Sequence, residues 1–253
     1  MRIAVVSDIH GNFLALEAVI ADLRLQSPDI VLQGGDLPYG GCHAAEVMDR
    51  VEELGWPGVI GNTDEVLWNT NRLGLLMVEA PKLRPLLKMI VRCAVATKSL
   101  IGDSRLCTLQ AFPTELRQDG VALMHASPGD LWKSPMDSSD DATLERVYAP
   151  LGARIVVYGQ IHRPFIKRLP GFTLCNSGSV GMPYDGDPRA SYLLLTDGQP
   201  EIRRVEYDIE AENESLLASN YPYKEWFAQV RICGAYVPPP EHDDSHRLHL
   251  SEE

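Results

Sequence analysis

The chain has 253 residues, of which 45% are hydrophobic and 23% are charged, and its formal net charge at pH 7 is −12. This length fits one large α/β domain or two small ones. No apolar run reaches the roughly 18–20 residues that a membrane-spanning helix needs, so no membrane partner is expected. The net negative charge argues against nucleic acid as a partner, because it repels phosphate at long range. If the protein binds phosphate, the positive charge that attracts it must be local.

The first 64 residues predict alternating strands and helices. Strands are expected at residues 2–8, 29–36 and 57–64, and helices at residues 12–25 and 43–54. In the first helix the apolar residues recur on one face, and Asn12 stands at the N-cap position. This β-α-β-α-β order implies a parallel sheet with right-handed crossovers.

The rest of the chain is helical at first and then rich in strands. Residues 65–112 predict mostly helix, interrupted by Pro81 and Pro85. Strands are expected as a pair within 114–128 and at 153–162, 165–169, 172–179, 190–198 and 201–209, and helices at 137–151 and within 210–233. We expect a single domain over residues 1–236 and a flexible tail over residues 237–253, where three prolines precede a polar run.

The cysteines indicate a reducing environment. Their number, five, is odd, and they are scattered with no Cys-x-x-Cys pair among them. The N-terminus shows no charged and apolar leader of the secretory kind. We therefore expect free thiols and a cytoplasmic protein.

Polar side chains follow five of the predicted strands at the point where each strand ends. They are Asp8 and His10, Asp36, Asn62 and Asp64, His125, and His162. Taken singly, each is more simply a turn residue, a helix cap or a packed histidine. Turn chemistry does not explain histidine at three strand ends, however, and the carboxyl ends of strands in an open α/β sheet form the ligand crevice. The side chains are therefore expected to converge on one site.

The donor types at these ends narrow the choice of metal. Aspartate, histidine and asparagine without cysteine suit Mn²⁺, Fe or Zn²⁺ better than Ca²⁺ or a structural zinc site, and enough donors are present for two divalent ions. Two ions roughly 3.5–4 Å apart, bridged by a carboxylate and a water, can clamp an in-line displacement at phosphorus. The bridging water loses a proton and becomes the nucleophile. The pattern thus predicts a phosphoesterase site.

The same residues, in this order, carry a family resemblance. Asp8-Ile9-His10, Gly35-Asp36, Gly61-Asn62, His125 and Gly159-Gln160-Ile161-His162 resemble the signature of the calcineurin-like metallophosphoesterases. Residues 176–192 are further similar to the YfcE-like phosphodiesterase branch, and the resemblance covers about residues 1–208. It implies an α/β fold in four layers, an αββα sandwich of two mixed β-sheets flanked by helices. It also implies hydrolysis of small phosphodiesters or nucleotide pyrophosphates, such as diadenosine polyphosphates, by metal-bridged hydroxide attack at phosphorus.

The resemblance also assigns the metal ligands. Asp8, His10 and His162 would hold the first ion, Asn62 and His125 the second, and Asp36 would bridge the two. Asp36, Asn62 and His125 are therefore expected to be catalytic as well. Mn²⁺ is the expected metal, with Fe or Zn²⁺ as alternatives.

Two positions depart from the family pattern. Gln160 stands where the family usually has a histidine ligand of the second ion. Its amide oxygen could still coordinate, but as a weaker and harder donor that favours Mn²⁺ or Fe over Zn²⁺. Thr63 stands where many members carry a histidine that protonates the leaving group. A protonated Asp64 could serve instead, although nearby cations would lower its pKa, so the general acid stays unassigned and good leaving groups are expected.

Asn12 and Arg163 are the candidate substrate-binding residues. Asn12 could contact the substrate beside the metals as well as cap its helix. Arg163, next to His162, could bind a phosphate through two N–H groups, although an exposed loop arginine fits equally well. Trp132 and Tyr39 follow ligand-bearing strands and could stack on a nucleobase, although packing under a loop is the commoner role.

Two other functions fit part of the pattern. A phosphoprotein phosphatase shares the early motifs, but the absent histidine after Asn62 and the segment 176–192 count against it. A non-catalytic metal-binding module would keep the fold and lose the chemistry, and Gln160 could mark such a loss. Against this, the main donors are all present, and many unpaired polar groups in one crevice are costly without a ligand. The sequence leaves the oligomeric state open.

Overall fold

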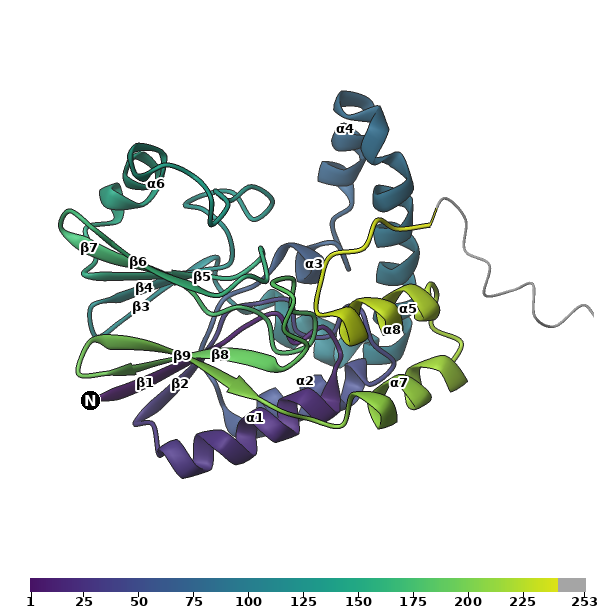
Figure 1. Ribbon diagram of the computed structural model, residues 1–253. Coiled ribbons are helices and arrows are strands. Elements are labelled where there is room, and N and C mark those ends of the chain that lie inside the picture. The colour runs from purple at the N-terminus through teal and green to yellow at the C-terminus, as the bar shows by residue number, and fades with distance from the viewer. Residues whose placement is uncertain (241–253) are drawn as a thin grey trace, which may run out of the picture.

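The computed structural model describes residues 1–240, in which two β-sheets lie face to face between helices (Figure 1). One sheet has the strand order β2-β1-β8-β9, and the other has the order β3-β4-β5-β7-β6. The strands are β1 (Arg2–Val6), β2 (Ile30–Gln33), β3 (Glu115–Gln118), β4 (Val121–Met124), β5 (Ile155–Tyr158), β6 (Phe165–Leu169), β7 (Phe172–Asn176), β8 (Ala190–Thr196) and β9 (Gln199–Val205). Each sheet contains parallel and antiparallel pairs, so the predicted pair of mixed sheets is confirmed.

The core between the sheets comes from alternate residues of the strands. In β1, Ile3 and Val5 belong to the cluster between the sheets, where β5 supplies Val157. Ala4 and Val6 belong to the cluster on the opposite face of the same strand. Successive side chains of a strand point to opposite faces, so an unbroken apolar run such as residues 3–6 serves two cores at once.

Helices cover the outer faces of both sheets and complete the predicted four layers (Figure 1). On the sheet that contains β1, α1 (Phe13–Gln26) lies against β8 and β9, α2 (Ala44–Leu54) and α7 (Ile209–Ala218) pack beside α1, and α8 (Lys224–Cys233) packs against α7. The other sheet is covered by α6 (Asp141–Tyr148) and the 3-10 turn Ala149–Leu151. Within residues 1–240, none of the helices combines the length and the apolar character that crossing a bilayer requires.

The helical segment that joins the two sheets rises to one side of the sandwich (Figure 1). It consists of α3 (Asn62–Glu65), α4 (Asn71–Glu79), the 3-10 turn Pro81–Leu83 and α5 (Arg84–Gln110). Pro81 and Pro85 both lie in the first turn of a helical element, where the missing N–H has no intrahelical partner to lose. The helix α5 bends at Gly102, whose φ is 69°.

The prediction of a third strand over residues 57–64 is wrong. Only a single parallel bridge, between Gln33 and Gly58, joins this segment to β2. The N–H of Ile60 donates instead to the carbonyl of Pro113, 3.0 Å away, and the chain then turns into α3. The apolar run is buried as predicted for a strand, but its backbone finds partners outside the sheet.

The flexible tail predicted for residues 237–253 lies mostly outside the described residues, which end at residue 240. Its first residue, Val237, has a fixed partner, because the indole N–H of Trp226 in α8 donates to its carbonyl over 3.0 Å. This bond holds the segment that follows α8, including Tyr236, against the body of the protein.

Main-chain hydrogen bonds tie the loops after the strands to one another. The N–H of His10 donates to the carbonyl of Asp36 at 3.0 Å, so the loops after β1 and β2 run side by side. The N–H of Gly159 donates to the carbonyl of His125 at 2.9 Å and joins the loops after β5 and β4 in the same way. The strand ends that carry the predicted site residues are therefore held in fixed pairs.

Candidate metal centre

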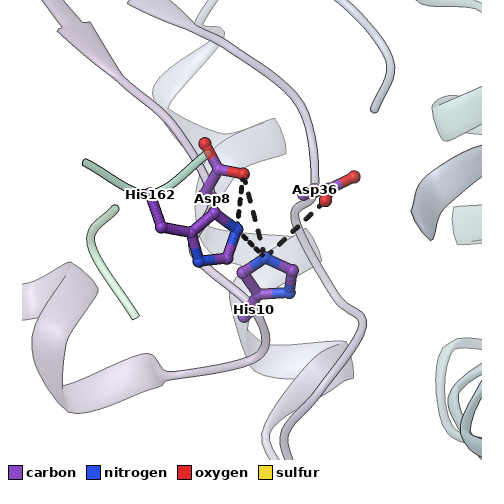
Figure 2. Close-up of side chains that lie close together, drawn as sticks. All are labelled: Asp8, His10, Asp36 and His162. Carbon is purple, nitrogen blue, oxygen red and sulfur yellow. Dashed lines mark hydrogen bonds and ion pairs between the residues drawn. The ribbon is translucent and has the colours of Figure 1, made fainter. Parts of the chain in front are cut away.

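Four ligand-type side chains meet where these loops converge (Figure 2). Asp8, His10, Asp36 and His162 are all buried, and one donor atom of each lies within 4.8 Å of the others. His162 Nε2 lies 3.1 Å from Asp8 Oδ1 and 3.2 Å from His10 Nε2. His10 Nε2 in turn lies 3.6 Å from Asp36 Oδ2. The loops after β1, β2 and β5 thus bring together donors that are up to 154 positions apart in the sequence.

A second group of donors lies on the other side of Asp36. His125 Nε2 is 3.4 Å from Asp36 Oδ2 and 2.9 Å from Asn62 Oδ1. Asp36 Oδ2 therefore has an imidazole Nε2 on each side, one from His10 and one from His125. The other carboxylate oxygen, Asp36 Oδ1, accepts the N–H of Thr63 at 2.9 Å, which fixes the plane of the carboxylate.

The three site histidines share one hydrogen-bonding pattern. In each, Nδ1 lies within hydrogen-bond distance of a main-chain carbonyl oxygen: Tyr39 for His10 (2.8 Å), Met182 for His162 (2.6 Å) and Gly34 for His125 (2.8 Å). A carbonyl only accepts, so each Nδ1 carries the hydrogen and each Nε2 faces the site. Metal-binding histidines are usually oriented through such bonds. The rings are therefore already aimed as ligands by the protein itself.

The backbone of this site is strained. Among the described residues, nine non-glycine residues have a positive φ, and five of them are predicted site residues. These five, with φ between 52° and 61°, are Asp8, His10, Asp36, Gln160 and His162. A left-handed conformation costs a non-glycine residue about 1–2 kcal/mol. Strain of this kind persists only where the surrounding structure imposes it, and here it accompanies four inward-facing ligand side chains.

Two glycines leave space for the carboxylates. A Cβ at Gly61 would collide with the carboxylate of Asp36, and a Cβ at Gly159 would collide with the carboxylate of Asp8 and the hydroxyl of Ser7. That hydroxyl donates to Asp8 Oδ2 at 2.6 Å. Glycine is required here by close approach rather than by an unusual φ, which at Gly61 is −101°.

Burial and neighbouring charges set the protonation of the histidines. Burial, reinforced by the adjacent His162, lowers the pKa of His10 to about 4. Burial also acts to lower the pKa of His125, but the Asp36 carboxylate outweighs it and raises that pKa to about 10. Although burial acts to raise the pKa of Asp36, the charge of His125 holds it below its usual range. In the metal-free protein near pH 7, His10 is thus neutral and His125 is charged.

Asp64 lies against the backbone of the two loops. Its Oδ2 accepts the N–H groups of Asp36 and Gly61, both at 2.8 Å, and its Oδ1 accepts that of Leu37 at 3.0 Å. The side chain is fully buried, and burial together with the charge of Asp36 raises its pKa to about 7. These bonds fasten the loop after β2 to the start of α3. They are the contacts of a positioning residue, and Asp64 as the general acid stays a prediction.

Gln160 sits beside the centre with its side-chain amide turned to a neighbouring loop. Its Oε1 accepts the hydroxyl of Ser134 at 2.5 Å, and its Nε2 donates to the carbonyl of Leu131 at 3.4 Å. Its main-chain N–H lies 3.2 Å from both carboxylate oxygens of Asp8. The backbone of Gln160 thus contacts the first group of donors, while ligation of a second ion by its amide stays a prediction.

The structure confirms Asn12 as the N-cap of α1. Its Oδ1 accepts the N–H of Ala15 at 3.0 Å. Its Nδ2 donates to the carbonyl of Gly181 at 3.2 Å and to the hydroxyl of Tyr207 at 3.0 Å. Both amide hydrogens are therefore used within the protein, and the fully buried side chain holds the loop after β1 in place.

A cleft of about 690 Å³ opens next to His162. Its lining includes the predicted residues Trp132 and Arg163 together with Tyr184 and Tyr236. Tyr184 stacks on the ring of His162, with centroids 4.3 Å apart and planes inclined at 18°, and Tyr236 meets Tyr184 edge-on. The side chain of Arg163 is 43% exposed, and its Nη1 lies 3.9 Å from Asp137 Oδ2, so a phosphate in the cleft would compete with a long, solvent-exposed ion pair.

Sequence reasoning missed two aromatic residues of this cleft, whereas Tyr39, outside the cleft, takes the commoner of its two expected roles. Tyr184 lies within the motif 176–192, which was the available signal, whereas no motif marks Tyr236. Tyr39, expected as a possible stacking residue, is only 4% exposed and packs edge-on against Phe227. Its contribution to the site is its carbonyl, which orients His10.

The donor set fits divalent metal ions. Histidine Nε2 lone pairs, carboxylates and an amide oxygen form the mixed nitrogen and oxygen set that Mn, Fe and Zn ions bind. Packing these groups together away from water is unfavourable unless a cation pairs with them. The orienting bonds on the Nδ1 atoms are those expected around a metal centre. The residues present therefore suit the metal that the sequence predicts.

Comparison with known proteins matches this chain to one family model, to a related sequence and to solved structures. The family model of the calcineurin-like phosphoesterase superfamily domain matches residues 1–198. An uncharacterised protein of Methanocaldococcus jannaschii is 27% identical over 261 residues, which cover 92% of this chain and 98% of that protein. A metallophosphoesterase structure from Sphaerobacter thermophilus has a TM-score of 0.76 at 24% identity, and a hypothetical protein structure from Pyrococcus horikoshii has 0.75 at 15%. In both comparisons the matched region covers 93% of this chain and 99% of the solved structure's chain, so the fold is shared over nearly the whole length.

Proposed function

The chain belongs to the calcineurin-like phosphoesterase superfamily, and we propose that its substrates are small phosphodiesters or nucleotide pyrophosphates, such as diadenosine polyphosphates. Membership makes the chain a metal-dependent hydrolase of phosphoric esters. The proposal adds the substrate class and the number of ions, which we take to be two. Mn²⁺ is the proposed metal, because carboxylate and amide oxygens make up much of the donor set and suit it.

The observation that carries the dinuclear proposal is the position of Asp36. One oxygen of its carboxylate lies 3.6 Å from His10 Nε2 and 3.4 Å from His125 Nε2, between the two groups of donors. A carboxylate oxygen shared in this way can bridge two ions. Asp8, His10 and His162 would complete one ion's ligands, and Asn62 with His125 would serve the other.

The chain's own residues define what happens around the ions. Divalent ions held here would supply positive charge that acidifies water and neutralises phosphoryl oxygens. The protein fixes the ligands beforehand, through the carbonyl bonds to the histidines and the Thr63 N–H on Asp36. Both oxygens of Asp64 already accept main-chain N–H groups, so this carboxyl is poorly placed to protonate the leaving group. This favours substrates whose leaving group departs as a stable anion.

The cleft beside His162 supports nucleotides within this class. Trp132, Tyr184 and Tyr236 offer aromatic surface, and stacking on such side chains accepts any nucleobase. Arg163 and Lys133 line the same cleft and provide the local positive charge that the acidic chain needs to attract phosphate. A nucleotide whose base lies in the cleft and whose phosphate lies at the metal centre would contact both the aromatic side chains and the metals.

The test is a substrate comparison on metal-depleted protein reloaded with Mn²⁺. We expect turnover of bis-p-nitrophenyl phosphate and diadenosine tetraphosphate to exceed that of p-nitrophenyl phosphate. Asp36→Asn should abolish this turnover, whereas Asp49→Asn, on the exposed face of α2, should retain it. Preference for the monoester would overturn the substrate class. Absence of turnover with Mn²⁺, Fe²⁺ and Zn²⁺ in folded protein would overturn the enzymatic proposal.

A further inference from the structure

A second cluster of metal-binding side chains lies apart from the centre described above. Cys42 and His43 directly precede α2, and Glu212 comes from α7. One donor atom of each lies within 4.8 Å of the others. Glu212 is fully buried, His43 is 25% exposed and Cys42 is partly buried, so the cluster is anchored inside the protein and open on one side. None of these residues belongs to the predicted phosphoesterase site.

The distances in this cluster approach those of a tetrahedral site. Zinc bonds of about 2.0–2.3 Å place neighbouring donors of a tetrahedron about 3.3–3.7 Å apart. His43 Nδ1 and Glu212 Oε1 are 3.2 Å apart, close to that spacing. The other oxygen, Glu212 Oε2, accepts the N–H of Leu14 at 3.2 Å, which fixes the carboxylate with Oε1 toward His43. Only the half-buried Cys42 would need a small adjustment to complete three ligands.

A metal ion here would compete with a proton on His43, because the hydrogen bonds to Cys42 and Glu212 raise the pKa of that imidazole to about 10. Arg231 of α8 is fully buried, and its Nη1 lies 3.5 Å from Glu212 Oε1, so one guanidinium already balances the carboxylate. The thiolate of Cys42 would add a further negative charge with no second lysine or arginine paired to it in the described contacts. A divalent ion would take the place of two protons, the one on His43 Nδ1 that now faces Glu212 and the one on the Cys42 thiol, and both would be released to solvent.

We propose that Cys42, His43 and Glu212 bind a zinc ion, with solvent at the fourth position. Cysteine, histidine and carboxylate are all ligands that zinc accepts, and three protein ligands leave one position open. The site would join the loop after β2 to α7. It would also reach the phosphoesterase centre indirectly, because Arg231 Nη2 lies 3.4 Å from the carbonyl of His10.

The chemistry of the two sites makes them easy to tell apart. The phosphoesterase centre has only nitrogen and oxygen donors, whereas the proposed site has a thiolate. Co²⁺ in place of zinc gives a sulfur-to-metal charge-transfer absorption only where a thiolate is bound. The inference is therefore tested independently of any phosphoesterase activity.

The experiment titrates metal-depleted, fully reduced protein with Co²⁺ and follows the near-ultraviolet absorption. At saturating Co²⁺ we expect a charge-transfer band whose intensity corresponds to one thiolate-bound ion per chain, both in the wild type and in Asp36→Asn, which impairs only the phosphoesterase centre. Cys42→Ser should lose the band, and Cys107→Ser, an exposed cysteine elsewhere on the chain, should keep it. Zinc content measured by mass spectrometry should fall by one ion per chain in Cys42→Ser and in His43→Gln.

Two results would overturn the proposal. One is the absence of a charge-transfer band in folded wild-type protein at saturating Co²⁺, a measurement that depends on no variant. The other is a band that survives in Cys42→Ser. In either case the cluster is a hydrogen-bonded ion network of His43, Glu212 and Arg231 without a metal.

Discussion

His10 and His162 face each other with their Nε2 atoms 3.2 Å apart, and each ring already uses its Nδ1 hydrogen on a main-chain carbonyl. A hydrogen bond across this gap needs a proton on one of the two Nε2 atoms, and without a proton or a metal ion the two lone pairs would point at one another. The carboxylates of Asp8 and Asp36 add negative charge to the same buried space. The arrangement is unfavourable by itself and favourable around a cation, so folding stability and metal binding are coupled.

Removal of metal is therefore expected to destabilise the fold. A ligand present at about 100 times its Kd stabilises the native state by about 2.7 kcal/mol. For a chain of this length that corresponds to a fall in Tm of about 5–10 °C on chelation. Differential scanning calorimetry with and without EDTA, followed by addition of Mn²⁺, measures this fall in Tm and its recovery. An unchanged Tm after verified metal loss would contradict the coupling.

Substitution of Asp64 by asparagine separates its two possible roles. An amide can accept the main-chain N–H groups at only one of its two ends, so the loops that carry Asp36 and Asn62 should loosen. We expect kcat to fall about 10–100-fold, as for other residues that orient metal ligands. If Asp64 acts only by positioning, the residual activity keeps the wild-type pH profile and leaving-group dependence. If it is the general acid, the alkaline limb of the profile disappears and the dependence on leaving-group pKa steepens.

The two donor groups should bind metal with different pH dependences. His10, with a pKa of about 4, is already neutral near pH 7, whereas His125, with a pKa of about 10, must lose a proton before it can coordinate. Below pH 10 the affinity that depends on His125 should therefore rise with pH, by up to about tenfold per unit. Calorimetric titration with Mn²⁺ in two buffers of different ionisation enthalpy counts the protons. His125→Gln should eliminate this proton release; equal release in both proteins would contradict the assignment.

Trp132 offers a test of base stacking in the cleft. Its indole N–H donates to Glu65 Oε2 at 3.0 Å, so the ring is held in place at the cleft wall. Loss of one stacked base costs about 1–3 kcal/mol, so Trp132→Ala should raise KM for diadenosine tetraphosphate by about 5–150-fold with little change in kcat. Trp132→Phe keeps the aromatic face and should retain most of the affinity. An equal loss in both variants would trace the effect to the Glu65 bond instead.

The positions of the site residues along the chain could be read from the sequence because strand ends are local features. Apolar runs followed by Asp8, Asp36 or His125 mark both a strand and its carboxyl end, and parallel strands bring such ends to one edge. The face-to-face sheets and the helices outside them were expected from the family resemblance. The segment 57–64 misled because an apolar run specifies burial, and the segment is buried with a single bridge to β2 in place of a strand.

The rest of the site depends on contacts between distant segments. That Gln160 would meet Ser134, or that Tyr236 would reach Tyr184, follows from loop geometry that has no periodic pattern. The roles of Asn12 and Asp64 show the same limit. From the residue type alone, each could be a helix cap, a metal ligand, a substrate contact or a general acid. Only the hydrogen-bond partners of the side chain distinguish among these roles.

The left-handed backbone at Asp8, His10, Asp36, Gln160 and His162 has a consequence for how this protein tolerates mutation. Glycine occupies that conformation more readily than aspartate or histidine does. A variant library screened only for abundance would therefore gain from replacing the side chains that we propose to serve the metal centre. Screening for catalysis would restore them. The two screens should diverge most sharply at these five positions, so a paired mutational scan would map the site without a structure of a bound complex.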